Sequence, residues 1–523
     1  MKASLARLAA IVRVDFLIRF RRASTLVVFL LLSAFAYVWI PDPATGWTLI
    51  QINGHRAIYN SGAVGMGTAS LGMIFVGLFG FYVISNAIRR DVVSRCGLVV
   101  AATPMRSGEY LLGKFVGNVV FLSTFLAGYM LTSMAMLIVR GEAPIEPLVF
   151  LQQYFLLCPA AVVFVSVAAV LFESIRFLSG KLGDVLYFFF WMAAIGLVVS
   201  DAASKGGISW ARYFDFTGFG FMIDQMMRTL HTTSVAIGAA PFDPHKATIV
   251  FPGLTLTRAW VAPRLVSTFA PLLFLPLAAL CFHRFDPGRT KQIAGKSRRN
   301  WLGRIQNLFK PLSRRLVVLL LGRIRPRQSL GAAIWNDAVM TFALHPLVLG
   351  AFLGITIASC FAPLAGLLPI VFALLALVVA DVATRDVRAN TLTSLRALPH
   401  LREKFVWWKL GSTLIVSLAF CAAALARTAS LGAMPLAALV VGVVFVASLA
   451  TSLGVLTTNS KAFIVLFLSF WYLVVNDRGA NRWFDFAGFY RVADLQTIVL
   501  YASLSVAALA GAQVFYRLRL PRA

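Results

Sequence analysis

The chain has 523 residues, of which 59% are hydrophobic and only 13% are charged. Soluble domains carry about twice this charged fraction, so a soluble enzyme, a disordered chain, a collagen-like chain and a disulfide scaffold are all excluded. The 48 Lys and Arg residues outnumber the 20 Asp and Glu residues and give a formal net charge of +28. In a membrane protein this excess has to be compared with the topology before it can indicate nucleic-acid binding.

Twelve apolar runs are long enough to cross a bilayer, which takes about 20 helical residues. In the first half they cover 24–40, 66–88, 114–139, 151–172, 184–201 and 266–283. In the second half they cover 343–360, 364–383, 409–428, 434–457, 461–476 and 496–515. We therefore predict an all-α polytopic membrane protein with twelve transmembrane helices. The long basic segment before the first run indicates an uncleaved span and not a secretory leader.

The spans predict two six-helix modules joined by a basic linker. The first module covers 1–283, the linker with a second amphipathic helix covers 284–342, and the second module covers 343–523. Within the linker, 284–327 has thirteen basic residues and one acid, and its apolar residues recur every three to four residues. This pattern predicts a helix on the anionic inner leaflet. A membrane-surface tether is favoured over a functional binding patch there.

The distribution of Lys and Arg predicts cytoplasmic N- and C-termini. With that orientation, 36 of the 48 basic residues lie in cytoplasmic segments, whereas the acidic residues divide equally between the two sides. The positive-inside rule accounts for nearly all of the basic excess, so nucleic acid is not expected as a partner. We expect a multi-pass protein of a bacterial plasma (inner) membrane, with the lipid bilayer as its surroundings.

A charged segment recurs between the second and third spans of each half. It consists of an Arg-Asp pair, a proline 13 residues after the Asp, and a lysine 10 residues after the proline, at a constant offset of 295 residues. The residues are Arg90, Asp91, Pro104 and Lys114 in the first half, and Arg385, Asp386, Pro399 and Lys409 in the second. Asp15 and Asp337, each before the first span of its half, form a weaker third pair.

A second repeat lies between the fifth and sixth spans of each half. The stretch 212–219 reads Arg-Tyr-Phe-Asp-Phe-Thr-Gly-Phe, and 482–489 reads Arg-Trp-Phe-Asp-Phe-Ala-Gly-Phe. Two repeats at equivalent positions indicate two parallel six-helix modules. Aromatic residues on both sides of a carboxylate suit interfacial anchoring with a helix cap at Asp215 or Asp485.

The loop 89–114 resembles the coupling segment of ABC-2 type transporter permeases. The similar features are the Arg90-Asp91 start, Thr103-Pro104 and the stretch from Tyr110 to Lys114. The six-span plan, an amphipathic helix before the first span and an external element before the sixth are also similar to that family. A weaker similarity links the chain to the permease part of fusions with M1-type aminopeptidases, although no peptidase lies in this sequence.

The resemblance implies cytoplasmic coupling helices that fit a groove of an ATP-binding subunit. The implied coupling residues are Arg90, Asp91, Thr103, Pro104, Arg385, Asp386, Arg396 and Pro399. The possible external gate comprises Phe214, Asp215, Phe216, Gly218, Phe484, Asp485, Phe486 and Gly488. The second half departs from the family pattern, with Arg396-Ala-Leu-Pro399 and Trp407-Trp408-Lys409. Each coupling residue is equally compatible with a membrane-boundary or capping role.

The sequence predicts no catalytic residue, metal site or cofactor in this chain. The stretch from Gly108 to Lys114 matches G-x-x-x-x-G-K, but Phe115 stands where a hydroxyl should bind magnesium, and no strand precedes it. The resemblance therefore implies that ATP and Mg bind two copies of a separate nucleotide-binding subunit. This chain itself is not expected to be an enzyme.

The leading hypothesis is the permease subunit of an ABC transporter that exports a hydrophobic or amphipathic substrate. The substrate itself is not identified by the sequence. The acids nearest the spans, Glu173, Asp184, Asp201 and Asp381, lie close to predicted ends, which disfavours a proton relay at mid-depth. Two alternatives stay open, namely a secondary ion-coupled transporter with twelve spans and a non-transporting ABC-like scaffold or sensor.

Overall fold

The computed structural model of the chain divides into two compact units, unit 1 (Met1–Ile293) and unit 2 (Ala294–Ala523). Their boundary falls inside the segment 284–342 that the sequence analysis assigned to the linker. The structure describes residues 2–21, 23–175, 177–203, 209–231, 235–283, 285, 309–315, 318–320, 329–344, 346–389, 391–395 and 401–519.

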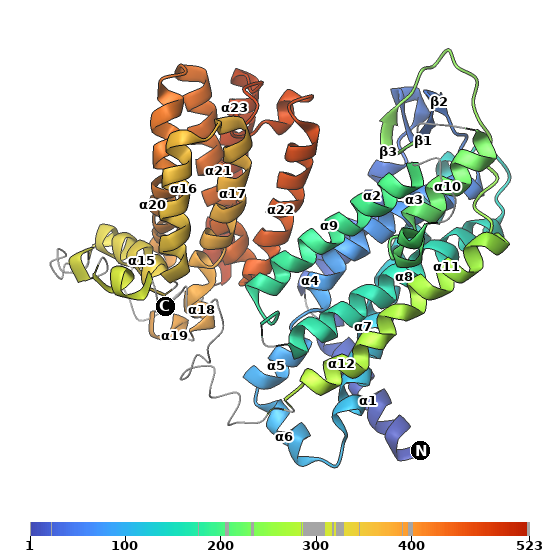
Figure 1. Ribbon diagram of the computed structural model, residues 1–523, viewed down its shortest axis with the longest axis horizontal. Coiled ribbons are helices and arrows are strands. Elements are labelled where there is room, and N and C mark those ends of the chain that lie inside the picture. The colour runs from blue at the N-terminus through green and yellow to red at the C-terminus, as the bar shows by residue number, and fades with distance from the viewer. Residues whose placement is uncertain are drawn as a thin grey trace. The chain divides into compact units, whose positions relative to one another are not determined.

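Unit 1 consists mainly of long apolar helices, drawn from blue to yellow-green in Figure 1. Its helices are α1 (Lys2–Phe20), α2 (Ala23–Trp39), α3 (Ser61–Phe75), α4 (Phe81–Ile84), α5 (Ala87–Val93), α6 (Cys96–Ala102), α7 (Ser107–Arg140), α8 (Pro147–Ser174), α9 (Lys181–Ala203), α10 (Phe219–Leu230), α11 (Arg258–Phe269) and α12 (Phe274–Cys281). Single turns are η1 (Pro43–Thr45), η2 (Val76–Gly80), η3 (Trp210–Phe214) and η4 (Ala270–Leu273). Its strands are β1 (Trp47–Ile52), β2 (His55–Arg56) and β3 (Val235–Pro241).

Unit 2 is also a bundle of long helices. They are α15 (Leu330–Leu344), α16 (Pro346–Phe361), α17 (Leu364–Val379), α18 (Arg385–Arg388), α19 (Leu392–Leu395), α20 (Leu401–Ala429), α21 (Ala433–Thr457), α22 (Ser460–Asp477) and α23 (Leu495–Arg519). Single turns are η5 (Val382–Thr384) and η6 (Arg482–Phe484).

Ten helical stretches in the described part of the chain are long and apolar enough to cross a membrane. They are Ser61–Val93, Ser107–Arg140, Pro147–Ser174, Lys181–Asp201, Arg258–Cys281, Leu364–Arg388, Leu401–Ala429, Ala433–Thr457, Ser460–Asp477 and Leu495–Leu518. An eleventh is added if α15 and α16, which are bent by 93° to each other, form one span. The predicted class of helical multi-pass membrane protein is confirmed.

Twelve spans stay a prediction, because two of the predicted spans fall on short helices. The first coincides with α2, which has 17 residues, and the seventh coincides with α16, which has 16. A helix crossing the hydrocarbon core upright needs about 20 residues. The other predicted runs fall on the ten long stretches.

The sequence analysis did not predict the small antiparallel sheet of unit 1, whose order is β2-β1-β3. Asn53 and Gly54, both with positive φ, join β1 to β2 in the tight turn that Asn-Gly favours. The buried side chains of Leu49, Ile50 and Ile52 hold β1 against the helices, and Leu49 lies on Gly67 of α3. Within unit 1 the sheet lies at one end and α5 and α6 lie at the other (Figure 1).

Candidate functional site

The first Arg-Asp pair belongs to a buried cluster of four charged side chains in unit 1. Asp15 of α1 pairs with Arg90 of α5, and the ammonium group of Lys114 of α7 lies 3.0 Å from the Asp15 carboxylate. The same ammonium group lies 2.7 Å from the carboxylate of Asp91. Tyr110, one turn before Lys114, donates its hydroxyl to Asp91 over 2.7 Å. The pair therefore faces the interior of unit 1, where it joins α5 to α1 and α7.

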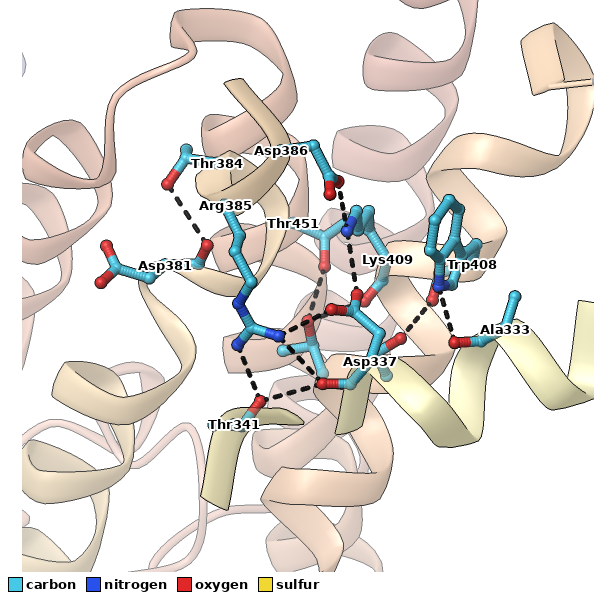
Figure 2. A network of polar contacts seen from close by, with 12 residues as sticks. Ala333, Asp337, Thr341, Asp381, Thr384, Arg385, Asp386, Trp408, Lys409 and Thr451 are labelled. Atoms are coloured by element: carbon cyan, nitrogen blue, oxygen red, sulfur yellow. Dashed lines mark hydrogen bonds and ion pairs between the residues drawn. The ribbon is translucent and has the colours of Figure 1, made fainter. Parts of the chain in front are cut away.

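Unit 2 contains the same cluster, drawn in Figure 2. The guanidinium group of Arg385 lies 2.7 Å from the carboxylate of Asp337 on α15. The ammonium group of Lys409 on α20 lies 2.9 Å from Asp337 and 2.6 Å from Asp386. Arg385 also donates to the hydroxyl of Thr341 over 2.9 Å.

The two clusters match residue for residue. Three of the four positions follow the 295-residue repeat. The fourth is an aspartate, Asp15 of α1 or Asp337 of α15, so the weaker pair belongs to the same site. Lys114 and Lys409 are almost completely buried, at 3% and 0% exposed. Removing one partner from a buried ion pair leaves an uncompensated charge and costs about 3–5 kcal/mol. Each cluster therefore strongly restricts the position of the loop that carries its Arg-Asp pair.

One difference between the clusters is balanced by a second. In unit 2, Thr341 lies four residues after Asp337. The equivalent residue of unit 1 is Arg19, four residues after Asp15, and its guanidinium group lies 3.8 Å from the Asp15 carboxylate. Unit 1 also has Glu173 at the end of α8, whose carboxylate accepts hydrogen bonds from the backbone N–H groups of residues 87–89 at the start of α5. The extra cation and the extra anion keep the buried site of unit 1 close to neutral.

An aromatic contact joins the end of each repeated loop, 89–114 and 384–409, to the last helix of its unit. Tyr110 stacks on Phe282, which follows α12, with ring centroids 5.5 Å apart. The residue 295 positions later is Phe405, which stacks on Tyr516 of α23 with ring centroids 4.6 Å apart. Phe285 fills the space above Gly97 of α6, where a methyl group would lie 2.4 Å from its ring. The loops thus contact the first, third and sixth predicted spans or their adjoining helices.

Two further predicted coupling residues, Thr103 and Pro104, lie at the end of α6. Thr103 follows α6 and donates its hydroxyl to the carbonyl of Val100 over 2.7 Å, and exposed Pro104 comes next. Arg396 and Pro399 lie outside the described residues. The exposed side chains of α5 and α6 include Val93 and Val99, at 74% and 69% exposed, and near them the polar residues Arg89 and Arg95. The exposed surface of this loop therefore combines apolar and basic side chains, whereas the Arg-Asp pair is largely covered.

The two Phe-Asp-Phe elements form the same turn. In each, the Asp N–H bonds the carbonyl of the preceding Arg, at 3.3 Å for Asp215 and 3.2 Å for Asp485. Gly218 and Gly488 have φ of 74° and 67°, which favours glycine because a side chain would be strained there. Both carboxylates are buried and accept backbone N–H groups, from Phe221 for Asp215 and from Tyr490, Val492 and Ala493 for Asp485.

The phenylalanine after each Asp is buried among aromatic side chains and does not lie at the surface. Phe216 stacks on Phe164 of α8 with centroids 4.5 Å apart. Phe486 lies 5.4 Å from Phe372 of α17 and 5.9 Å from Phe445 of α21. The phenylalanine before each Asp is less enclosed: Phe214 is half exposed and Phe484 is partly buried. The burial of Phe216 and Phe486 does not fit interfacial anchoring at these two positions, and anchoring by Phe214 and Phe484 stays a prediction.

Arg264 of α11 holds the first turn in place, and the sequence analysis did not single it out. Its buried guanidinium group donates to the carbonyl of Asp215 over 3.0 Å, and to the carbonyls of Leu156 and Leu157 over 2.8 and 3.1 Å. In unit 2 the hydroxyl of Tyr501 on α23 donates to the carbonyl of Trp483 over 2.7 Å. Each turn is thus fixed to the last long helical stretch of its unit, Arg258–Cys281 or Leu495–Leu518, by different chemistry.

The stretch that resembles a phosphate-binding loop is helical throughout, since Gly108 to Phe115 lies within α7. Lys114 is held there by two carboxylates. The described residues contain no group of three or more His, Cys, Asp or Glu side chains able to hold a metal ion. No protein-family model, curated protein or solved structure matches this chain.

Proposed function

We propose that the chain is the membrane subunit of an ATP-driven exporter of the ABC-2 type, with ATP hydrolysed by separate nucleotide-binding subunits, one at each unit's loop. It would reside in a bacterial plasma membrane with both termini in the cytoplasm. The observation that carries the proposal is the duplicated cluster of Asp15, Arg90, Asp91 and Lys114 with its counterpart in unit 2.

The geometry supports a mechanical role for the loop of unit 1. A force applied to α6 would reach α1 and α7 through buried ion pairs, and α12 through the contacts of Phe282 and Phe285. Ion pairs that are buried and hydrogen-bonded yield little under load, because separating them exposes uncompensated charge. The loop therefore moves with the helices around it as one body.

The exposed apolar side chains of α5 and α6 support docking of a protein and not of a nucleotide. Val93, Leu98 and Val99 are exposed on two short helices that precede a predicted span. Burial of exposed valines and leucines stabilises an interface by about 25 cal/mol per Å² of apolar area. In this proposal Arg90 and Asp91 position the docking face, and the apolar residues contact the partner.

The buried carboxylates favour this mechanism over an ion-coupled transporter. Asp215 and Asp485 are already engaged by backbone donors, and Asp15 and Asp337 by cations. A carboxylate that takes up and releases a proton or sodium ion during transport has to change its partners in each cycle. The substrate class stays hydrophobic or amphipathic in this proposal.

The test is reconstitution of the chain in lipid nanodiscs with and without a Walker-motif ATPase encoded beside it. The chain alone should hydrolyse no ATP, and turnover should rise when the ATPase binds. Val99→Glu should reduce binding and turnover by more than about tenfold, since it places a charge in an apolar interface. The matched control Val250→Glu, an equally exposed valine beyond β3, should leave both unchanged. Hydrolysis by the isolated chain, or equal effects of the two variants, would refute the proposal.

A further inference from the structure

The second predicted span of unit 1 contains one wide turn, η2, which is of π type and lies between α3 and α4. A π-turn inserts an extra residue into a helix and leaves a carbonyl outside the regular hydrogen-bond ladder. Here the carbonyl of Gly77 accepts the hydroxyl of Tyr187 on α9 over 2.5 Å. The fifth predicted span therefore holds the irregular turn of the second.

Trp191, one turn after Tyr187 on α9, packs directly on the same glycine. A methyl group on Gly77 would lie 1.7 Å from the ring carbon Cζ2 of Trp191, so only glycine fits. The indole is fully buried, and its Nε1–H makes no hydrogen bond to the described residues. Leaving a buried donor without a partner is costly, which makes this group an unexplained feature of unit 1.

Unit 2 has a related contact in which the tryptophan is hydrogen-bonded. The dipeptide Phe190-Trp191 of α9 recurs as Phe470-Trp471 of α22. There the indole Nε1–H of Trp471, which is only partly buried, donates to the carbonyl of Pro369 on α17 over 2.8 Å. Helix α17 is a continuous α-helix that contains Pro369. In unit 2 the second predicted span thus provides a hydrogen-bond acceptor for the tryptophan of the fifth. In unit 1 the corresponding hydrogen bond is not made.

The turn η2 lies between the two repeated elements of unit 1. On one side, the ring of Trp191 lies 5.9 Å from Phe164, which stacks on Phe216 of the Phe-Asp-Phe turn. On the other side, α4 leads to Asn86, whose φ of 76° marks a break, and then to α5 with its Arg-Asp pair. A change in η2 would shift α5 relative to α3.

We propose that η2 is a hinge with two states. In the first state, which the structure shows, the indole Nε1–H of Trp191 makes no hydrogen bond; in the second state it donates to a carbonyl of the second predicted span, as Trp471 donates to Pro369 in unit 2. This hinge does not depend on ATP or on a nucleotide-binding partner.

The test is hydrogen–deuterium exchange of the full chain in lipid nanodiscs, comparing Trp191→Phe with Trp471→Phe. Trp191→Phe removes a hydrogen bond that is made only in the second state, so the second state should become less populated. If amides in 77–84 exchange through that state, they should exchange about fivefold more slowly, which corresponds to the net contribution of one hydrogen bond. Trp471→Phe removes a bond that the described state makes, so amides around Pro369 should exchange about fivefold faster. The two variants therefore have opposite predicted effects.

Either faster or unchanged exchange of 77–84 in Trp191→Phe would overturn the hinge. If the smaller ring prevents folding, benzothienylalanine at position 191 retains the bicyclic shape and replaces only the N–H by sulfur. The same slowing is expected of it, and the same two contrary results would overturn the proposal.

Discussion

Lys114 and Lys409 occupy the same place in the two units. Each ammonium group lies between two carboxylates, one from the helix before the unit's first span and one from the Arg-Asp pair after its second. A lysine so buried is stable as a cation only when paired. This relationship explains why the charged residues recur together in the sequence: each buried charge is neutralised by the opposite charges of the other residues in its cluster.

Replacing Lys409 with methionine should destabilise unit 2 by about 3–5 kcal/mol, because Asp386 would lose its ion pair and Asp337 would keep only Arg385. The measurement is thermal unfolding of the purified chain in nanodiscs. Lys404→Met, an exposed lysine on the same helix, is the matched control and should change stability little. Adding Asp337→Asn to Lys409→Met should recover part of the loss. A double variant less stable than the single one would contradict the assigned pairing.

The two Phe-Asp-Phe turns should respond differently to loss of their anchors. Arg264→Met removes a buried cation that bonds three carbonyls, and it should destabilise unit 1 by about 3 kcal/mol or more. Tyr501→Phe removes one hydroxyl bond and should cost unit 2 about 1 kcal/mol. Thermal unfolding and exchange of amides in 212–221 and 482–493 are the measurements. Equal losses would mean that Arg264 does not hold its turn.

The sheet of unit 1 should loosen in acid because of Glu142. Its carboxylate accepts two hydrogen bonds from Arg56, at 2.7 and 2.8 Å, and one from the N–H of Tyr59 at 3.0 Å. Burial raises the pKa of Glu142, but these hydrogen bonds outweigh burial and hold the pKa below its ordinary 4.5. A lowered folded-state pKa gives stability that is present above the unfolded pKa and is lost as the pH falls through the folded one.

The protection factors of amides in 47–59, in which the intrinsic pH dependence of exchange is removed, should therefore fall below about pH 4.5, the ordinary pKa of a glutamate. Glu142→Gln should remove most of this pH dependence, since it takes away the titrating group. Protection that falls equally with acid in both proteins would show that another group controls the sheet.

The sequence predicted the helices well because apolar runs of membrane length are a strong signal. The run 434–457 became α21 (Ala433–Thr457), and 461–476 became α22 (Ser460–Asp477). Helices extend beyond the apolar run where polar residues continue the helical ladder, as at Arg258 of α11 and Ser61 of α3. The constant offset of 295 residues also predicted which charged residues are equivalent.

The sequence could not predict that the side chains of the Arg-Asp pairs face the interior of each unit. Asp15 and Arg90 are 75 residues apart, and no periodicity relates them; only the folded arrangement of α1 and α5 does. The sheet joins β1 to β3 across four long helical stretches, although the Asn53-Gly54 signal for its hairpin is present in the sequence. Phe216 and Phe486 were named as possible gate residues, but their burial was not predicted, because an aromatic residue beside a carboxylate also suits an interface.

The most direct test of the account is the sidedness of the two equivalent loops. In a cysteine-free variant, single cysteines are placed at Val99 and at Ser394, the exposed residue 295 positions later. A membrane-impermeant maleimide should label neither position in intact cells and both in inverted vesicles, while Val250→Cys should be labelled in intact cells. Labelling of Val99 and Ser394 from opposite sides, or of either from outside, would contradict two parallel units that present matching cytoplasmic loops.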